Sequence, residues 1–527
     1  MSLHSMLFSS LAIGAQSQAF ELANFNVTDA LVQQGVNLSA LPELAPLADR
    51  SSDFACHIAC DSLQTLYGAD AVDYDDEPSY TSFTGAYWST IPAEVKPSCI
   101  FRPSTPASVS VLVLIARLSQ CPFAVKSGGH SAFAGGASIE GGVTVSLENL
   151  REVRLAADRE TVAVQPGNTW SRVLSKLNDT GAGLTYGLVC DNVASFDVST
   201  YTEAYLVALF PEKYVLGVVT ASGVVVNASP TQFPDLYWAL RGGGNNFGIV
   251  VSFNMMTRPL PNDLLFGGTR VFAEANFPQV AKAYIDMSLN SAQDPKAGGW
   301  VVWLSVGGQR LALTELWYAA PLAAGADAPL LSAFYDIEAV SDSTKTRGHA
   351  EYVRDGHSFY GQRQVYYVLS VKLAAHPEFA ARTVDVFWDA VGGALGGVKG
   401  VLPLLIWQHV TEASLKASKR NGGIPWGLIR LAGLYLSCSW RLVYKTMSDI
   451  MKQIKQESRD LGIENDWVYM NYASQYQDVI ASYGAENKER LKRVAEMYDP
   501  RGVFQTLQPG YFKLDRAAKP DARYFSH

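Results

Sequence analysis

The chain has 527 residues, of which 48% are hydrophobic and 17% charged, and its net charge is -8. This length exceeds one ordinary hydrophobic core, so we expect a globular protein with two or more substructures rather than a disordered one. The acidic balance and the lack of a long Lys/Arg run argue against nucleic-acid binding. The longest apolar runs, such as residues 109–116, are too short to cross a bilayer, so no membrane partner is expected.

The N-terminus has the pattern of a secretory signal peptide. An apolar run, residues 6–15, precedes small residues at Ser17-Gln18-Ala19, although no Lys or Arg stands before the run. A buried first helix is the alternative. We expect residues 1–19 to be a signal peptide and the protein to be secreted or to pass through the secretory pathway. Sequons for N-glycosylation are compatible with this route and occur at Asn26, Asn37, Asn178 and Asn227.

Four of the six cysteines precede residue 122, whereas Cys190 and Cys438 stand apart. The four are Cys56, Cys60, Cys99 and Cys121. Two disulfides among them would fit an oxidising compartment, but their spacing does not give the pairing. Because no Cys-X-X-Cys pair or Cys/His cluster with zinc spacing occurs, a metal site is not expected.

The first part of the chain is predicted to be largely helical. Residues 41–70 have a helical pattern and lead into an acidic loop at residues 73–77. Ser104-Thr105-Pro106 then opens a helix over residues 107–118, because proline is tolerated in the first turn.

Short apolar strands separated by glycine follow this helix. They are expected at residues 123–125, 142–147, 153–155 and 161–164. After Pro166-Gly167 a helix is expected over residues 169–177, with Asn168 as its N-cap. Residues 215–226 are predicted to form a hairpin that turns at residues 221–223. A short helix over residues 233–241 then leads through a glycine-rich loop, 242–248, into a strand over 249–256.

Residues 265–465 are predicted to form a second region with longer elements. Strands are expected at residues 300–306 and 364–371, and helices at residues 379–391 and 440–460. A last helix is expected over residues 487–498. Strands interleaved with helices indicate an α+β or α/β protein.

The stretch from Phe123 to Ser131 carries the first chemical signal. A strand ends at Lys126-Ser127, two glycines follow, and His130 stands at the tip. Two adjacent glycines allow a positive φ and leave no Cβ to keep a ligand away, so exposed N–H groups can bind phosphate oxygens. A surface turn with a chance histidine is the alternative reading of these residues alone.

The other glycine loops do not match a common nucleotide motif. Gly242 and Gly244 are followed by Phe247 where a dinucleotide fingerprint needs its third glycine, and no P-loop is present. Several separate glycine turns at strand ends would instead suit an extended dinucleotide held by converging loops.

Four separated motifs resemble the FAD-linked oxidases of the berberine-bridge-enzyme-like group, within the vanillyl-alcohol-oxidase superfamily. They are residues 125–131 (VKSGGHS), 235–248 (DLYWALRGGGNNFG), 469–472 (YMNY) and 498–504 (YDPRGVF). Residues 419–423 (KRNGG) match a further feature of fungal members, and the resemblance covers about residues 50–512. It implies an α+β fold with a two-part PCMH-type FAD-binding domain and a substrate domain whose antiparallel sheet is covered by helices. The implied parts are residues 45–262 for FAD, 263–465 for substrate, and 466–515 for a C-terminal return to the FAD-binding domain.

The resemblance implies FAD as the cofactor, attached covalently through the imidazole of His130. It also assigns a set of cofactor-binding residues around that histidine and at two distant segments. The set is Lys126, Ser127, Gly128, Gly129, His130, Ser131, Gly248, Val250 and Asn471.

Catalysis would need a base, because flavin accepts a hydride while the substrate loses a proton. The resemblance makes Tyr469 and Tyr472 the candidates. An ordinary tyrosine has a pKa of about 10, so cations or the flavin would have to lower it. The alternative is an aromatic strand packed on the core. Glu412, Lys416 and Trp407 are further side chains that could face a substrate.

One region departs from the family pattern. Residues 178–189 are shorter than the corresponding passage of the relatives, and residues 199–217 are an insertion. The missing passage would carry a second, cysteinyl flavin link, so at most one link is expected. We expect an oxidoreductase that acts on a small organic molecule, a secondary-metabolite intermediate, with O2 as acceptor. There are two alternatives. The protein could be a carbohydrate oxidase, or a catalytically impaired member of the family that serves as a binding or scaffold module.

Overall fold

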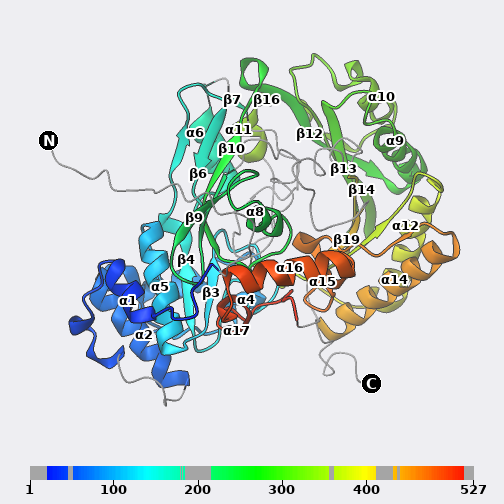
Figure 1. Cartoon of the computed structure of the whole chain (residues 1–527). Coiled ribbons are helices and arrows are strands. Elements are labelled where there is room, and N and C mark those ends of the chain that lie inside the picture. Colours follow the sequence, from blue (N-terminus) through cyan, green and yellow to red (C-terminus); the bar gives the residue numbers. More distant parts are fainter. Residues whose placement is uncertain are drawn as a thin grey trace.

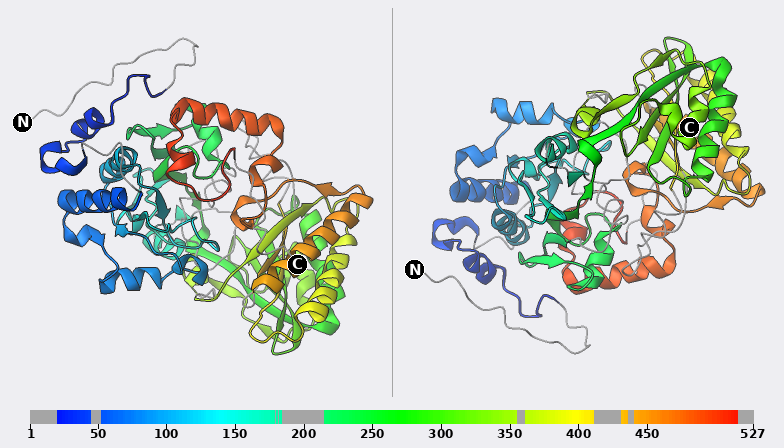
Figure 2. Two further views of the ribbon diagram at one scale, coloured as in Figure 1. Left: turned by 90° about the horizontal axis from the view of Figure 1, so that it is seen from below. Right: turned by 90° about the horizontal axis from the view of Figure 1, so that it is seen from above.

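We describe a computed structural model of the chain, and the description covers residues 20–44, 52–178, 180, 182–183, 215–354, 361–410, 431–435 and 440–515. The chain forms two lobes (Figures 1 and 2). The first lobe contains two smaller sheets together with the N-terminal and C-terminal helices, and the second contains one large sheet. Several expectations lie outside the described residues: the signal peptide, Cys190, Cys438, Glu412, Lys416, residues 419–423 and most of the altered region after residue 178.

The strand that leads to His130 belongs to a mixed sheet in the first lobe. In the described residues this sheet has the order β1-β2-β4-β3, and β2 and β3 both run parallel to β4. Its strands are β1 (Val72–Asp73), β2 (Cys99–Phe101), β3 (Phe123–Lys126) and β4 (Val143–Ser146). The helices before and between them are α1 (Val27–Gln33), α2 (Ser52–Tyr67), α3 (Pro78–Thr84), α4 (Thr90–Ala93) and α5 (Pro106–Ser119).

Two disulfides fasten helix α2 to this sheet. Cys56 pairs with Cys121, just before β3, and Cys60 pairs with Cys99, the first residue of β2. The structure therefore confirms that the four clustered cysteines form two bridges, and it supplies the pairing that spacing could not give. Both bridges are buried in the core that supports the His130 strand.

The second sheet of the first lobe is antiparallel, with the order β5-β6-β10-β8-β9 in the described residues. Its strands are β5 (Val153–Leu155), β6 (Thr161–Val164), β8 (Val215–Val219), β9 (Val225–Ala228) and β10 (Ile249–Met256). Two further helices accompany it, α6 (Trp170–Leu177) and α8 (Pro234–Leu240), and β7 (Ala182–Gly183) pairs with β11 (Arg258–Pro259).

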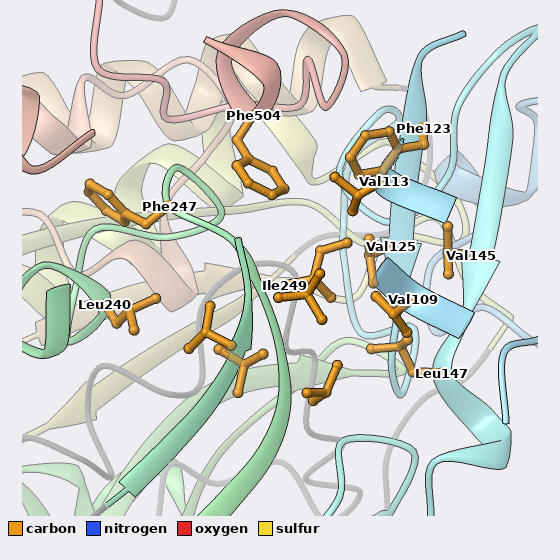
Figure 3. Packing of buried hydrophobic residues seen from close by; sticks show 14 of the residues in the cluster. Val109, Val113, Phe123, Val125, Val145, Leu147, Leu240, Phe247, Ile249 and Phe504 are labelled. Atoms are coloured by element: carbon orange, nitrogen blue, oxygen red, sulfur yellow. The ribbon is translucent and has the colours of Figure 1, made fainter. Parts of the chain in front are cut away.

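A single hydrophobic core joins the two sheets and the C-terminal helices. Figure 3 shows Ile249 of β10 opposite Val125 of β3, with Phe504 approaching from the C-terminal side. The rings of Phe123 and Phe504 meet edge to face, with centroids 6.3 Å apart. The C-terminal helices are α15 (Val479–Ser482), α16 (Ala485–Tyr498) and α17 (Val503–Thr506). The end of the chain thus completes the core that begins near its start.

The second lobe is built on a nine-stranded sheet within the described residues, and all its strand pairs are antiparallel. Its main strands are β12 (Leu264–Ala273), β13 (Ala297–Val306), β14 (Gln309–Tyr318), β17 (Tyr366–Val371), β18 (Leu404–Gln408) and β19 (Leu431–Tyr435). Three short strands, β15 (Ser341–Asp342), β16 (Lys345–Gly348) and β20 (Glu464–Asn465), pair at its margins.

Helices cover the outer face of this sheet, away from the first lobe (Figure 1). They are α9 (Phe277–Leu289), α10 (Pro329–Tyr335), α12 (Phe379–Ala390) and α14 (Trp440–Asp460), while α11 (His349–Arg354) packs near α6. The helix-covered face has a hydrophobic core of its own. The other face is turned toward the first lobe, and the junction between the lobes holds the candidate site. No helix in the described ranges is both long and apolar enough to span a bilayer.

One local prediction, the N-cap of α6, was wrong. The helix at residues 170–177 is capped by Thr169, whose hydroxyl accepts a hydrogen bond from the Arg172 N–H, whereas the Asn168 side chain donates to the carbonyls of Glu152 and Gln165. The acidic loop predicted at residues 73–77 is present over residues 74–77. Its first residue, Asp73, instead ends strand β1, where an ion pair with Arg102 offsets the cost of burying its charge.

Candidate active site

The Gly-Gly-His loop leaves the end of β3 with a conformation that glycine makes possible. Gly129 has a φ of +77°, and a Cβ at this residue would lie 2.6 Å from Cε of Lys126. Lys126 is buried, and its ammonium lies 4.6 Å from the ring centroid of Phe83 and 5.2 Å from that of Tyr87. These cation–π contacts hold the lysine beneath the loop.

The serines on either side of the loop fix it to the surrounding backbone. The Ser127 hydroxyl donates to the carbonyl of Pro166, in the turn that precedes α6. The Ser131 hydroxyl donates to the carbonyl of Phe133 at 3.1 Å. The start of the loop is therefore fastened to the turn at Pro166, which follows β6 of the second sheet. The end of the loop is fastened to the backbone two residues further along the chain.

The imidazole of His130 stacks on an aromatic side chain that the sequence did not single out. Its ring centroid lies 4.0 Å from that of Trp88, with an angle of 16° between the planes. Trp88 in turn lies 5.8 Å from the ring of Tyr366, on β17 of the second lobe, and Tyr366 lies 6.5 Å from the ring of Tyr472. This aromatic series, defined as His130, Trp88, Tyr366 and Tyr472, connects the predicted attachment residue with a predicted base.

The Tyr-Met-Asn-Tyr segment is a short 3-10 turn (Met470–Tyr472) and not a strand. Both tyrosines are buried, and their rings meet edge to face at 5.3 Å. The amide nitrogen of Asn471 donates to the hydroxyl of Tyr469 at 2.8 Å. The hydroxyl of Tyr472 accepts a long hydrogen bond, 3.5 Å, from Nε2 of Gln408 at the end of β18.

Alternation along β18 decides which of its side chains reach the junction. Leu405 and Trp407 point into the helix-covered core, where Nε1 of Trp407 donates to the Thr383 hydroxyl at 3.1 Å. Trp407 therefore does not face the junction between the lobes, where the predicted cofactor-binding and catalytic residues lie. Gln408, the next residue, points toward the junction and donates to Tyr472 there.

A buried carboxylate lies on the same face of the large sheet. The register of β12, β14 and β13 places Thr269, Glu315 and Trp300 in one row. Burial raises the pKa of Glu315, while hydrogen bonds from Tyr352 and Thr269 and the charge of Arg347 oppose that rise. Both carboxylate oxygens accept a hydrogen bond, at 2.5 Å from Tyr352 and 2.7 Å from Thr269. Glu315 is thus held by its own side-chain network.

Gly248 and Val250 lie where β10 begins, within the core between the two smaller sheets. A Cβ at Gly248 would lie 2.7 Å from the carbonyl oxygen of Val219, so the close approach of β8 requires glycine there. Val250 is buried and pairs with Val218 on β8. Ile249 between them faces Val125, so the start of β10 lies across the core from the strand that leads to His130 (Figure 3).

Three buried amide groups give a test of whether a cofactor fits these residues. The Oδ1 atoms of Asn168 and Asn471 and the Nδ2 atom of Asn245 have no hydrogen-bond partner among the described residues. Asn168 adjoins the turn that Ser127 contacts, Asn471 adjoins Tyr472, and Asn245 belongs to the glycine-rich loop before β10. Because buried polar groups are normally satisfied, unused donors and acceptors next to the His130 loop, next to the start of β10 and in the Tyr-Met-Asn-Tyr segment fit an extended polar ligand such as FAD.

Comparisons with known proteins agree with this fit. A family model described as an FAD binding domain matches residues 97–191. The FAD-dependent monooxygenase tpcD of Cochliobolus heterostrophus is 30% identical, over 88% of this chain and 95% of that protein. The bifunctional solanapyrone synthase of Alternaria solani is 27% identical, over 87% of this chain and 89% of that protein.

Solved structures share the fold at lower identity. Berberine bridge enzyme from Eschscholzia californica has a TM-score of 0.65 and 16% identity, covering 88% of this chain and 100% of that chain. Xylooligosaccharide oxidase from Myceliophthora thermophila has a TM-score of 0.64 and 21% identity, covering 89% of this chain and 99% of that chain.

The fold and the comparisons define an oxidoreductase class with a PCMH-type FAD-binding fold and a large antiparallel sheet. Within that class, the chain belongs to the berberine-bridge-enzyme-like family of FAD-dependent oxidoreductases, whose fungal relatives include proteins named FAD-dependent monooxygenases. The α+β fold and the family predicted from the sequence are confirmed.

Proposed function

We propose that this protein oxidises a small organic molecule, a secondary-metabolite intermediate, using FAD attached covalently through His130 and O2 as the final acceptor. FAD would supply the hydride acceptor. The chain itself would bind the cofactor, orient the substrate at the junction of the lobes and take up the substrate proton.

The observation that carries this proposal is the aromatic series that connects His130 with Tyr472. Side chains from the His130 loop, from the second lobe and from the C-terminal segment meet there, within ring distances of 4.0 to 6.5 Å. Asn471, with a buried oxygen available for a ligand, lies beside the tyrosines. A cofactor held at His130 and a substrate beside it would both be within reach of these groups.

Tyr472 and Tyr469 remain the proposed bases, in that order. Gln408 donates to the Tyr472 hydroxyl, and a hydrogen bond of this kind would stabilise the phenolate form in which Tyr472 could take up a substrate proton. The Tyr469 hydroxyl already accepts a hydrogen bond from Asn471 and is further from the aromatic series. We propose a supporting role for Tyr469.

The lining of the junction favours an aromatic or polyketide-like substrate over a carbohydrate. Trp88, Tyr366 and Ala132 form a small apolar cluster there, with Leu404 and Ile406 packed against it. Such a surface suits stacking with a planar apolar molecule.

Passage through the secretory pathway is part of the proposal, because two buried disulfides suit an oxidising compartment. We also propose that residues 45–262 form the FAD-binding domain, 263–465 the substrate domain and 466–515 the C-terminal return. The membership of the three larger sheets and of the C-terminal helices supports these limits.

Anaerobic reduction tests the proposed reaction. The purified protein should be yellow, and candidate aromatic alcohols or polyketide intermediates should bleach the flavin band without O2. Readmission of O2 should restore the band and release one hydrogen peroxide per turnover. A protein that stays colourless after FAD is added would instead support a binding or scaffold module, and bleaching by oligosaccharides alone would support a carbohydrate oxidase.

A further inference from the structure

We propose that Trp88 is a positioning residue for flavin attachment. Its indole would set the plane of the His130 imidazole, and contacts from the second lobe would hold the indole in place. This inference rests on the proposed function, because it assumes that His130 is the attachment residue. It goes beyond that function by giving the attachment reaction a residue outside the Gly-Gly-His loop.

The stack between the two rings is close and nearly parallel, at 4.0 Å and 16°. The backbone reinforces it, because the N–H of Trp88 donates to the carbonyl of Gly129 at 3.1 Å. Trp88 is buried, with 3% of its surface exposed. Trp88 therefore contacts the His130 loop twice, through the stacked rings and through a backbone hydrogen bond to Gly129.

The second lobe holds Trp88 from another direction. The N–H of Gly361 donates to the Trp88 carbonyl at 3.1 Å, and the N–H of Thr90 donates to the carbonyl of Gln362 at 3.0 Å. The Ser89 hydroxyl accepts from the N–H of Gln364 at 3.2 Å. Residues 361–364 thus run alongside residues 88–90, and Tyr366 follows them into contact with the indole. The position of Trp88 depends on docking of the two lobes.

The chemistry of attachment makes the ring plane important. In the balanced reaction the imidazole nitrogen forms a bond to the 8α carbon of FAD, and one C–H bond of that methyl group breaks. Two protons leave, one from the methyl group and one from the imidazole or its tautomer partner, and two electrons pass to O2, which becomes hydrogen peroxide. The attacking lone pair lies in the plane of the imidazole. A stacked indole keeps that plane fixed and leaves the ring edge to meet the carbon, which reduces the orientational cost of the reaction.

Variants of Trp88 test the role directly. Protein made under riboflavin limitation would be mixed with FAD in air, and flavin that survives acid precipitation would be followed over time. Trp88→Leu should attach flavin about tenfold more slowly than wild type, since an aromatic pair contributes on that scale. Trp88→Phe should remain within about twofold because it keeps an aromatic face. The matched control is Trp388→Leu, which removes a buried tryptophan from the helix-covered core and should attach at the wild-type rate.

The outcomes separate this inference from the proposed function. If Trp88→Leu binds FAD and attaches it at the wild-type rate, the positioning role is wrong while the proposed function stands. If wild type takes up no FAD, the proposed function fails, and the stack is then tested in the flavin-free protein by NMR. An upfield-shifted imidazole proton that is absent from His130→Ala should move downfield in Trp88→Leu and stay in Trp388→Leu. An unchanged shift in Trp88→Leu would overturn the stack.

Discussion

The side-chain amide of Asn471 donates a hydrogen bond of 2.8 Å to the hydroxyl of Tyr469, while its buried oxygen has no partner among the described residues. The amide is therefore oriented by the protein and has an acceptor left for a ligand. A polar group of FAD that donates to this oxygen would satisfy it, and burial would strengthen the bond.

Replacing Asn471 with Ala should weaken FAD binding by about 1 to 3 kcal/mol, the cost of an unmade buried hydrogen bond. The measurement is the dissociation constant of FAD in a His130→Ala background, where attachment does not mask binding. Asn487→Ala is the control, because that amide donates to the carbonyl of Tyr483 and is not among the predicted cofactor contacts. Equal affinity of the Asn471 and Asn487 variants would show that Asn471 does not contact the cofactor.

Replacing Tyr472 with Phe should slow flavin reduction by about 100-fold, the usual contribution of a general base, while the spectrum of the bound flavin persists. Tyr469→Phe should slow it less, because Tyr469 is assigned a supporting role. Stopped-flow absorbance under anaerobic conditions gives the rates. Tyr483→Phe, at another buried tyrosine, is the control and should reduce at the wild-type rate. If neither Tyr472→Phe nor Tyr469→Phe slows reduction, the base lies elsewhere.

Gly129→Ala should remove most of the bound flavin. An alanine at a φ of +77° is strained by about 1 kcal/mol, and its Cβ would also displace Lys126 from between two aromatic rings. Gly141→Ala separates these effects, because Gly141 has a φ of +64° but open space around its Cβ. We expect Gly141→Ala to lower the melting temperature slightly and keep its flavin. Equal flavin content in the two variants would mean that the loop tolerates the displacement.

Asp499 should make the stability of the protein depend on pH in a defined direction. Burial raises the pKa of Asp499 from 3.8 to about 6, although hydrogen bonds from the N–H groups of Phe504 and Val503 oppose the rise. Between these two pKa values the folded state binds more protons than the unfolded state, so the protein loses stability as the pH rises. The stability that Asp499 contributes is therefore fully present below about pH 4 and is lost by about pH 6.

The comparison of wild type with Asp499→Asn isolates that group from the other carboxylates. Between about pH 4 and pH 6, the free energy of unfolding of wild type should fall by about 3 kcal/mol relative to that of Asp499→Asn. Above about pH 6 the difference between the two proteins should no longer change with pH. Denaturant titrations at several pH values measure it. A difference that does not change with pH would show that the carboxyl titrates normally in the folded protein.

The sequence predicted those parts of the fold that depend on local patterns. The strand at residues 249–256 and the helix at 440–460 have the predicted bounds, because their apolar spacing is regular and their ends are marked by glycine or polar residues. Strands β12 and β14 were not predicted. Gly267 and Gly268 interrupt the apolar pattern of β12. Strand β14 follows the turn at Gly307-Gly308 and pairs with β13, and only β13 was predicted.

The candidate site was predictable only where a motif carries it. His130 and the Tyr-Met-Asn-Tyr segment could be named from the sequence, and the structure connects them through side chains that no motif indicates. Trp88 and Tyr366 are far apart in the chain, and they meet because residues 361–364 dock beside residues 88–90. Similarly, only strand alternation in the assembled sheet shows that Gln408, and not Trp407, faces the junction.

Flavin fluorescence on a denaturing gel tests the central claim most directly. Wild-type protein, precipitated with acid and washed, should carry one flavin per chain that fluoresces with the protein band. His130→Ala should fold, bind FAD and lose it completely on precipitation. A fluorescent band that persists in His130→Ala, or a wild-type protein that binds no FAD, would contradict the account.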